Sequence, residues 1–460
     1  MMTKKAAATL DYPTAAASQM VQALARREVR AIDLAEAAIA RIEALDGKIN
    51  AVVVRDFDRA RAAAKAADQA LARGDRRPLL GVPMTVKEAN HTVGMPSTWG
   101  LEPFAAWTAT VDAVGVARLK AAGAVILGKT NVPPNLADWQ SNNPVYGRTR
   151  NPHNLERTPG GSSGGSAAAL AAGMVPLELG SDIGGSIRVP AHFCGVFGHK
   201  PSWGLVPLAG HSPPAVIGGT DIELGVIGPM ARTAGDLALA LSVLAGPTGD
   251  YAKAWRLDLP SPRGRRIGDF RVLILDNHPL AAVSREIIGI LHGLADRLAN
   301  AGAKVERRSP RLPDLAAAHG QYLAMLQVLM TLGRPQPEGA PPPMSAEAWI
   351  MGLNMREAVR RSWAALFEDF DVVLAPPFGT TAFPHDDSPP EGRTLTIDGA
   401  QVPYFSQLAW SSIATFPGLP STCVPVGRSA EGLPVGVQII GPYWEDQTTI
   451  AFAGFIEQAG

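Results

Sequence analysis

Two neighbouring glycine-rich stretches, Thr158-Pro-Gly-Gly-Ser-Ser-Gly-Gly-Ser-Ala-Ala-Ala-Leu-Ala-Ala-Gly173 and Gly180-Ser-Asp-Ile-Gly-Gly-Ser-Ile-Arg-Val-Pro190, decide the architecture of this 460-residue chain. Glycine lets the backbone adopt positive φ and lets backbone amides approach a ligand closely. The first stretch continues directly into alanine and leucine residues that favour a helix, which a flexible Ser/Gly linker would not do. We therefore interpret both stretches as structured turns that form a site.

Serines in these stretches are candidate nucleophiles. Ser162, Ser166 and Ser186 each follow two glycines, so neighbouring side chains leave each hydroxyl unobstructed. Backbone N–H groups beside such a hydroxyl are suited to stabilise a developing oxyanion. The spacing alone does not distinguish among the three serines, and a pair of flexible turns is the alternative interpretation.

A lysine upstream is a candidate base. The run Gly81-Val-Pro-Met-Thr-Val-Lys87 places Lys87 at the end of an apolar segment. Most lysines are solvated, but burial beside these apolar neighbours would lower the pKa of Lys87 from its usual value of about 10.4. A lysine that is neutral can act as a general base.

The rest of the chain alternates between helical and strand-like segments. Helical periodicity occurs at residues 31–45, 60–73, 111–122 and 284–300, and short apolar runs typical of buried strands occur at 124–127, 174–179, 272–275, 303–307 and 371–374. Strands separated by helices predict an α/β fold with a mixed, mostly parallel β-sheet covered by helices on both faces. The proline-rich segment 333–343 is interpreted as a surface excursion, with an interdomain linker as the alternative.

Composition excludes several classes of protein. Lysine plus arginine and aspartate plus glutamate both number 42, so the formal net charge is zero and nucleic-acid binding is not expected. Cys194 and Cys423 form neither a disulfide framework nor a metal motif. His192 and His199 flank Cys194 without a fourth ligand, so no metal site is expected. The apolar stretch 167–177 is shorter than the ~20 residues of a membrane span, and we expect a soluble, cytoplasmic protein.

Taken together, the motifs resemble those of the amidase signature family of serine hydrolases. The resemblance rests on Lys87, on the two glycine-rich stretches, and on segments that occur in the family's order: 118–131 (RLKAAGAVILGKTN), 146–154 (YGRTRNPHN), 198–204 (GHKPSWG), 228–238 (GPMARTAGDLA), 417–427 (PGLPSTCVPVG) and 432–442 (GLPVGVQIIGP). It implies a single amidase signature domain over residues 1–460. Its expected parts are a helical segment (about 1–75), a signature core (about 76–250) and a C-terminal α/β part (about 265–460). The chain departs from the family's pattern at Glu88, at 132–134 and at Thr415.

The resemblance implies a Ser–Ser–Lys triad. Ser186 is expected to be the nucleophile that accepts the acyl group. Ser162 is expected to be the bridging serine, on a cis peptide bond, and Lys87 the base that withdraws a proton through Ser162. Ser163 is the alternative bridge.

The resemblance also implies the surroundings of the nucleophile. The oxyanion hole is expected to consist of the backbone N–H groups of Ile183, Gly184, Gly185 and Ser186. Asp182 and Arg188, on either side of this loop, are expected to have structural or positioning roles. None of these roles needs a metal or another cofactor, so neither is expected.

The function implied by the family is hydrolysis of carboxylic amides through an acyl-enzyme, with aryl esters and carbamates as further candidate substrates. The alternative is the glutaminase (A) subunit of a tRNA-dependent amidotransferase, which would need a partner protein. The tract 370–378, together with 382–386, resembles bacterial acylamidases and therefore favours the hydrolase. A non-catalytic binding protein on the same scaffold would have no need of all three triad residues.

Three variable segments predict the kind of substrate. Residues 99–107, 207–220 and 322–355 are rich in leucine, methionine, proline and tryptophan and contain few charges. We therefore expect a small-molecule amide with an apolar acyl or aryl group, bound by a monomer or homodimer with no nucleic-acid or membrane partner.

Two other stretches of the sequence fit the consensus pattern of a known motif at every position. Gly123-Ala-Val-Ile-Leu-Gly-Lys-Thr130 fits the P-loop pattern, but its middle residues are predicted to be a strand, with Lys129 beginning the following loop. Residues 161–165 fit the G-x-S-x-G nucleophile elbow, but no strand is predicted before them. Neither nucleotide binding nor an α/β-hydrolase site is expected.

Overall fold

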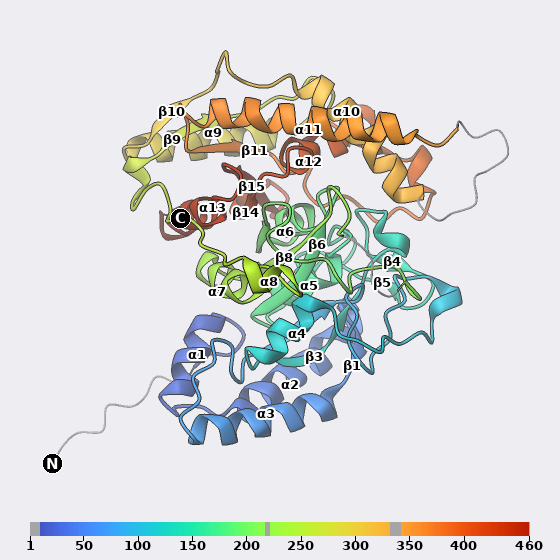
Figure 1. The fold of residues 1–460 in the computed structure, drawn as a ribbon, viewed down its shortest axis with the longest axis vertical. Helices are drawn as coiled ribbons and strands as arrows, with labels where there is room; N and C mark the ends of the chain where they lie inside the picture. Colours follow the sequence, from blue (N-terminus) through green and yellow to red (C-terminus); the bar gives the residue numbers. More distant parts are fainter. Residues whose placement is uncertain (1–9, 217–220, 332–341, 460) are drawn as a thin grey trace.

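An eleven-stranded sheet runs through the computed structural model, which describes residues 10–216, 221–331 and 342–459 (Figure 1). Its strand order is β1-β3-β2-β6-β8-β7-β14-β15-β11-β9-β10. The strands are β1 (Val52–Arg55), β2 (Pro83–Lys87), β3 (Val125–Thr130), β6 (Leu177–Asp182), β7 (Phe197–Lys200), β8 (Val226–Ala231), β9 (Arg271–Ile274), β10 (Lys304–Glu306), β11 (Val372–Ala375), β14 (Ser421–Arg428) and β15 (Pro434–Ile440). Because this one sheet takes strands from all parts of the chain, it supports the interpretation of a single domain.

The sheet is mixed, as the sequence predicts, but its parallel pairs lie in two groups. β3, β2 and β6 are parallel neighbours, and so are β11, β9 and β10. The neighbours between these groups, from β6 through β8, β7, β14 and β15 to β11, are antiparallel, as is the β1 edge. The expectation of mostly parallel strands therefore describes the two groups and not the centre, where a short connection joins β14 directly to β15.

Helices cover both faces of the central strands. On one face lie α5 (Gly164–Ala171) and α6 (Arg188–Cys194), and on the other lie α4 (Val114–Ala121), α7 (Ala234–Leu244) and α13 (Asp446–Ala459). Glycines allow these layers to approach closely. A Cβ at Gly180 of β6 would lie 3.1 Å from Ile187, and one at Gly115 of α4 would lie 3.2 Å from Leu179 on the opposite face.

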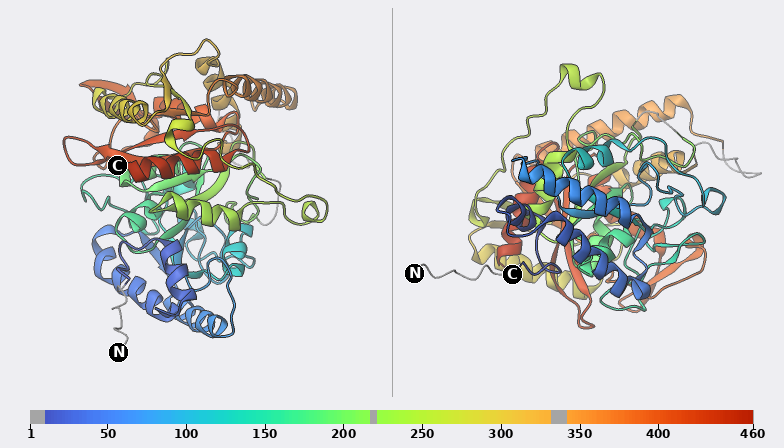
Figure 2. Two further views of the ribbon diagram at one scale, coloured as in Figure 1. Left: turned by 90° about the vertical axis from the view of Figure 1, so that its left-hand side faces the viewer. Right: turned by 90° about the horizontal axis from the view of Figure 1, so that it is seen from below.

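The N-terminal segment and residues 285–366 supply helices to opposite ends of the molecule (Figures 1 and 2). At one end lie α1 (Ala17–Ala25), α2 (Ala31–Ile49) and α3 (Phe57–Ala72), and at the other lie α9 (Arg285–Asn300), α10 (Leu315–Thr331) and α11 (Ala346–Leu366). Among the described residues, no helix combines the length and the apolar character that crossing a membrane requires.

Most predicted elements are found close to their expected places, and the largest difference lies at β6. The segment 174–179 is predicted as a strand, whereas β6 covers Leu177–Asp182 because antiparallel pairing with β8 continues to Asp182↔Val226. This pairing carries the strand up to the loop that holds Ser186. Most of the predicted excursion at 333–343 lies outside the described residues.

Candidate active site

The expected triad residues come from segments that meet at the carboxyl ends of the neighbouring strands β2 and β6. Lys87 is the last residue of β2, and Ser186 follows the end of β6. These parallel strands pair through Val86↔Leu179, so their carboxyl ends lie side by side. Ser162 directly precedes the short loop into α5, a helix that packs against both strands.

Hydroxyl groups surround the amine of Lys87, whose side chain is fully buried. Lys87 Nζ lies 2.6 Å from Ser162 Oγ, 3.0 Å from Ser163 Oγ and 2.8 Å from Ser181 Oγ. The Gly161–Ser162 peptide bond is cis, as the family resemblance implies for the bridging serine. The chain therefore brings Lys87 and both serines of the pair together.

The electrostatic setting of Lys87 favours its neutral form. Burial lowers the pKa of Lys87 from 10.5 to about 7, against the opposing influence of the Asp182 and Glu178 carboxylates. Because the charged form loses its hydration on burial, a substantial fraction of the amine is unprotonated near neutral pH. This is the state in which the amine can accept a proton.

A tight loop presents Ser186. Gly185 has φ +94°, and a Cβ at this position would lie 2.3 Å from Ser411 Oγ of α12 (Leu408–Thr415). Only glycine suits such a position. The carbonyl of Ser186 accepts a hydrogen bond from the backbone N–H of Ser163 at 3.1 Å, which ties this loop to the serine pair.

One of the four N–H groups expected in the oxyanion hole is engaged elsewhere. The Gly185 N–H donates to Asp182 Oδ1 at 2.9 Å, because the Asp182 carboxylate folds back under the loop. Within the described chain, the N–H groups of Ile183, Gly184 and Ser186 have no acceptor. Three of the four expected donors are therefore free to bind an oxyanion, and Gly185 instead serves to shape the loop.

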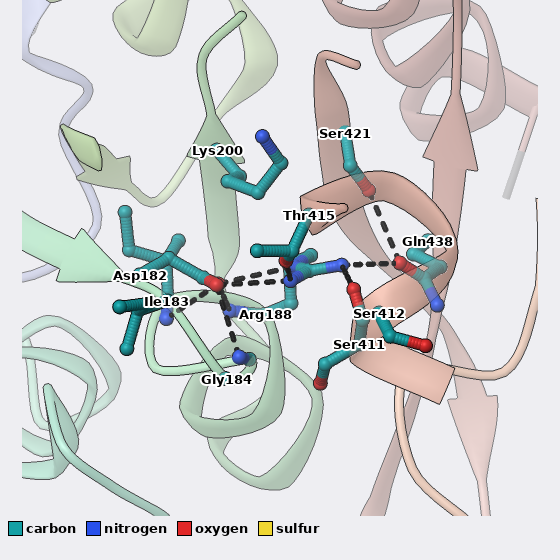
Figure 3. Close-up of polar contacts among 12 residues, drawn as sticks. Asp182, Ile183, Gly184, Arg188, Lys200, Ser411, Ser412, Thr415, Ser421 and Gln438 are labelled. Carbon is teal, nitrogen blue, oxygen red and sulfur yellow. Dashed lines mark hydrogen bonds and ion pairs between the residues drawn. The ribbon is translucent and has the colours of Figure 1, made fainter. Parts of the chain in front are cut away.

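Asp182 and Arg188 form a buried ion pair beneath the loop (Figure 3). Arg188 Nη2 and Nε lie 2.9 and 3.0 Å from the Asp182 carboxylate, and the guanidinium also donates to Gln438 Oε1 at 2.9 Å and Thr415 Oγ1 at 2.9 Å. Burial alone would raise the pKa of Asp182, but Arg188 and backbone N–H groups outweigh it and lower this pKa to about 2. Asp182 is thus charged near neutral pH, and the ion pair ties the loop to the C-terminal half of the chain.

Two aromatic side chains hold carbonyl groups of the same loop. Tyr322 OH of α10 donates to the carbonyl of Ile183 at 3.0 Å, and Trp139 Nε1 donates to the carbonyl of Gly184 at 3.0 Å. Both side chains are buried. Sequence reasoning did not assign them a role, although Tyr322 begins the variable segment 322–355.

Comparison with known proteins places this site in a family. The sequence matches the Amidase family over residues 33–334 and 330–450. The chain belongs to the amidase signature family. Membership identifies it as an enzyme that hydrolyses carboxylic amides, as predicted from the sequence.

Individual relatives are similar along almost their whole length. The chain is 35% identical over 481 aligned residues to the putative amidase AmiB2 of Mycobacterium tuberculosis (strain ATCC 25618 / H37Rv), covering 98% of this chain and 97% of the relative. It is 34% identical over 483 residues to a subunit of the glutamyl-tRNA(Gln) amidotransferase of Roseiflexus sp. (strain RS-1), covering 93% of each. The structure superposes on a bacterial aryl acylamidase of the amidase signature family with a TM-score of 0.79 at 27% identity, covering 97% and 96% of the two chains.

The departures from the family's pattern have identifiable contacts. Glu88 accepts hydrogen bonds from the backbone N–H groups of Thr98 and Trp99, and so fixes the start of the segment 99–107. Thr415 accepts a hydrogen bond from Arg188. Both residues therefore shape the surroundings of the site without joining the triad.

The P-loop-like motif is a buried strand, as predicted, with one correction. Val125–Thr130 form β3, so Lys129 lies within the strand and does not begin the following loop. Its fully buried amine donates to the carbonyl of Pro96 and to Ser97 Oγ. The backbone of this segment belongs to a sheet ladder, with partners in β1 and β2.

The histidines near Cys194 have structural contacts. His192 Nε2 lies 2.9 Å from the carbonyl of Thr380, and His199 Nε2 lies 3.1 Å from Asp446 Oδ1. Within the described ranges, no three histidine, cysteine, aspartate or glutamate side chains are grouped as metal ligands.

Proposed function

We propose that Ser186, Ser162 and Lys87 are the catalytic residues of this amide hydrolase. The observation that carries the proposal is the 2.6 Å contact between Lys87 Nζ and Ser162 Oγ at a fully buried lysine with a pKa of about 7. A serine hydroxyl becomes an effective nucleophile only when a base takes its proton. A buried amine on a bridging hydroxyl supplies that base.

The contacts of Ser163 support Ser162 as the bridge. Besides the hydrogen bond from Lys87, Ser163 Oγ donates to the carbonyl of Ser181 at 3.3 Å and lies 3.4 Å from the Ser181 N–H, so its other contacts are directed to β6. Its backbone N–H holds the Ser186 carbonyl. We assign Ser163 a supporting role, in which it fixes Lys87 and the nucleophile loop.

The proposed reaction uses these residues in two half-reactions. Neutral Lys87 accepts the proton of Ser162 as Ser162 accepts that of Ser186, and Ser186 Oγ attacks the amide carbonyl carbon. The N–H groups of Ile183, Gly184 and Ser186 stabilise the resulting oxyanion. The C–N bond then breaks as Ser162 gives a proton to the leaving amine and regains one from Lys87, so Lys87 is neutral again and the acyl group stays on Ser186. Water attacks this ester in the same way and releases the carboxylic acid.

The surroundings of the oxyanion loop support a substrate with an apolar acyl or aryl group. Ile183 of this loop packs on an apolar cluster, drawn mainly from α10, α11 and α12, whose members are Leu224, Ala318, Tyr322, Met325, Leu326, Leu329, Trp349, Leu353, Val359, Leu408 and Phe416. The loop expected to bind the oxyanion therefore borders a buried apolar cluster. Apolar groups are buried favourably beside such side chains, which offer no charged partner to an amino acid.

Labelling and a substrate panel test the proposal together. A fluorophosphonate is expected to modify Ser186, and Ser186→Ala is expected to abolish turnover without changing the melting temperature appreciably. Purified enzyme is expected to hydrolyse anilides and primary amides with apolar acyl groups, assayed beside esters, carbamates and glutamine. Modification of Ser162 or Ser163 in place of Ser186 would show that the nucleophile is wrongly assigned.

The similarity to an amidotransferase component gives the alternative function a specific test. A glutaminase of this kind would release ammonia from glutamine and would depend on a partner protein for that activity. The proposed enzyme is expected to be active alone, as a monomer or homodimer, and inactive on glutamine. Turnover of glutamine with no turnover of apolar amides would favour the alternative.

A further inference from the structure

The orientation of each peptide unit in the oxyanion loop decides where its N–H points. A peptide unit is planar, and in its usual trans form the C=O and N–H point in opposite directions. A group that holds the carbonyl of one residue therefore aims the N–H of the next. The Ile183 carbonyl is held by Tyr322 OH at 3.0 Å, so Tyr322 sets the direction of the Gly184 N–H.

Two other peptide units of this loop are held from both sides, whereas the unit between Gly185 and Ser186 is held at its carbonyl by the Val189 N–H. The unit between Gly184 and Gly185 is fixed by Trp139 at its carbonyl and by Asp182 at its N–H. The unit after Ser186 is fixed by the Ser163 N–H at its carbonyl and by Asp182 at its N–H, at 3.1 and 3.0 Å.

The peptide unit between Ile183 and Gly184 differs from these neighbours. Among the described residues, its hydrogen-bond partner is Tyr322 alone. Gly184 also lacks a Cβ that would restrict rotation of this unit. Loss of the Tyr322 hydroxyl would therefore free the Gly184 N–H to turn.

Tyr322 is itself held rigidly. Its side chain is fully buried, and its ring stacks on His319 with centroids 5.9 Å apart and an interplanar angle of 26°. Burial raises the pKa of Tyr322 above its ordinary value, so the hydroxyl keeps its proton and stays a donor. A rigid donor that does not titrate near neutral pH is suited to fix a backbone direction.

We propose that Tyr322 is a positioning residue for catalysis, which acts through the Ile183 carbonyl to aim the Gly184 N–H at the developing oxyanion. This inference rests on the proposed function, in which the Gly184 N–H is one of the oxyanion donors. Such a donor stabilises the transition state more than the bound substrate, because negative charge develops only as the carbonyl is attacked. Removal of the hydroxyl is therefore expected to lower kcat with little change in KM.

The experiment compares Tyr322→Phe with the matched control Tyr12→Phe. Tyr12 is also buried and also donates its hydroxyl to a backbone carbonyl, that of Met174, at 3.0 Å, but it lies outside the site. Both changes keep the ring and remove one hydrogen bond of the same kind. We expect Tyr322→Phe to lower kcat by about tenfold or more, because loss of a complete oxyanion donor costs roughly 10²–10³ in kcat. Tyr12→Phe is expected to leave kcat and KM within twofold of the wild-type values.

A trifluoromethyl ketone gives a readout that a merely structural role would not move. Its adduct with the nucleophile carries an oxyanion, so its affinity is expected to fall by the same factor as kcat in Tyr322→Phe. The pH at which activity rises is expected to stay unchanged, because Lys87 is not altered. Substituting 4-aminophenylalanine for Tyr322 keeps a donor in place and is expected to restore much of the activity.

The possible outcomes separate this inference from the proposed function. The kcat of each variant is calculated from the concentration of active sites, which is determined by complete labelling with a fluorophosphonate. Partial unfolding of a variant therefore does not obscure its kcat. A Tyr322→Phe enzyme with kcat and inhibitor affinity within twofold of wild type would overturn the inference, as would a loss of kcat accompanied by a shifted pH profile. If Ser186→Ala remained active, the proposed function itself would fail, whatever the result at Tyr322.

Discussion

The pH dependence of turnover is the most direct consequence of the buried lysine. With a pKa of about 7, Lys87 is neutral in about a tenth of molecules at pH 6, about half at pH 7 and about nine-tenths at pH 8. A lysine with the ordinary pKa of 10.5 would be neutral in only about three molecules in ten thousand at pH 7. Burial therefore raises the amount of active base at neutral pH by about 10³-fold.

The assay measures kcat/KM for a neutral anilide between pH 5.5 and 9.5. We expect a tenfold rise per pH unit at the acidic end and a plateau above pH 8, because the base must be neutral in the free enzyme. Lys87→Arg is expected to be inactive, since arginine keeps its proton throughout this range. A profile that is flat from pH 5.5, or near-normal turnover by Lys87→Arg, would refute the role of Lys87 as base.

A neighbouring carboxyl group allows a finer test of the same reasoning. Glu178 is buried on β6, and burial raises its pKa to about 7, while its negative form raises the pKa of Lys87. Glu178→Gln removes that influence, so the acidic limb is expected to move to lower pH. Since Lys87 and Glu178 titrate in the same pH range in the wild type, the acidic limb of the profile reports an apparent pKa that belongs to the pair. A limb that moves to higher pH in Glu178→Gln would contradict this account.

Three further predictions concern the loop, the ion pair and the P-loop-like strand. Gly185→Ala is expected to lower kcat more than tenfold and to reduce stability by about 1–3 kcal/mol, because φ is +94° and the new Cβ would meet Ser411 Oγ; kinetics and thermal unfolding check this. Arg188→Met is expected to destabilise the fold by about 3–5 kcal/mol in urea unfolding, since Asp182 would stay buried without its partner, and Asp182→Asn in the same chain is expected to recover part of the loss. ATP with magnesium is expected to leave the melting temperature unchanged and EDTA to leave activity unchanged, whereas an ATP-dependent shift that Lys129→Ala removes would show that the motif binds nucleotide.

The catalytic candidates could be recognised from the sequence because their signals are local. Lys87 ends an apolar run, which predicts that the base is buried. Ser162 and Ser186 each follow a glycine pair, so no bulky neighbour in the sequence obstructs either hydroxyl. The alternation of strands and helices was likewise visible, since periodicity is a property of short segments. The choice among the serines needed more than spacing and came from the family resemblance.

The direction of the strands and of the loop's N–H groups could not be predicted in this way. β6 continues to Asp182 because β8 pairs with it, and the Gly185 N–H points to Asp182 because the carboxylate folds under the loop. The length of β6 depends on a distant strand. The Gly185 contact spans only three residues, but the Asp182 carboxylate is paired with Arg188, which is itself held by the distant Gln438 and Thr415.

The sequence, read together with the family resemblance, determined which residues we propose for the chemistry of this protein, and tertiary structure alone decided how they are held. Arg188 reaches Gln438 across 250 positions, and Tyr322 reaches the Ile183 carbonyl across 139 positions. A residue's chemical type is present in the unfolded chain, whereas hydrogen-bond direction and the loss of hydration exist only after packing. Packing is also what lowers the pKa of Lys87, because desolvation requires the sheet and helices to close around the amine.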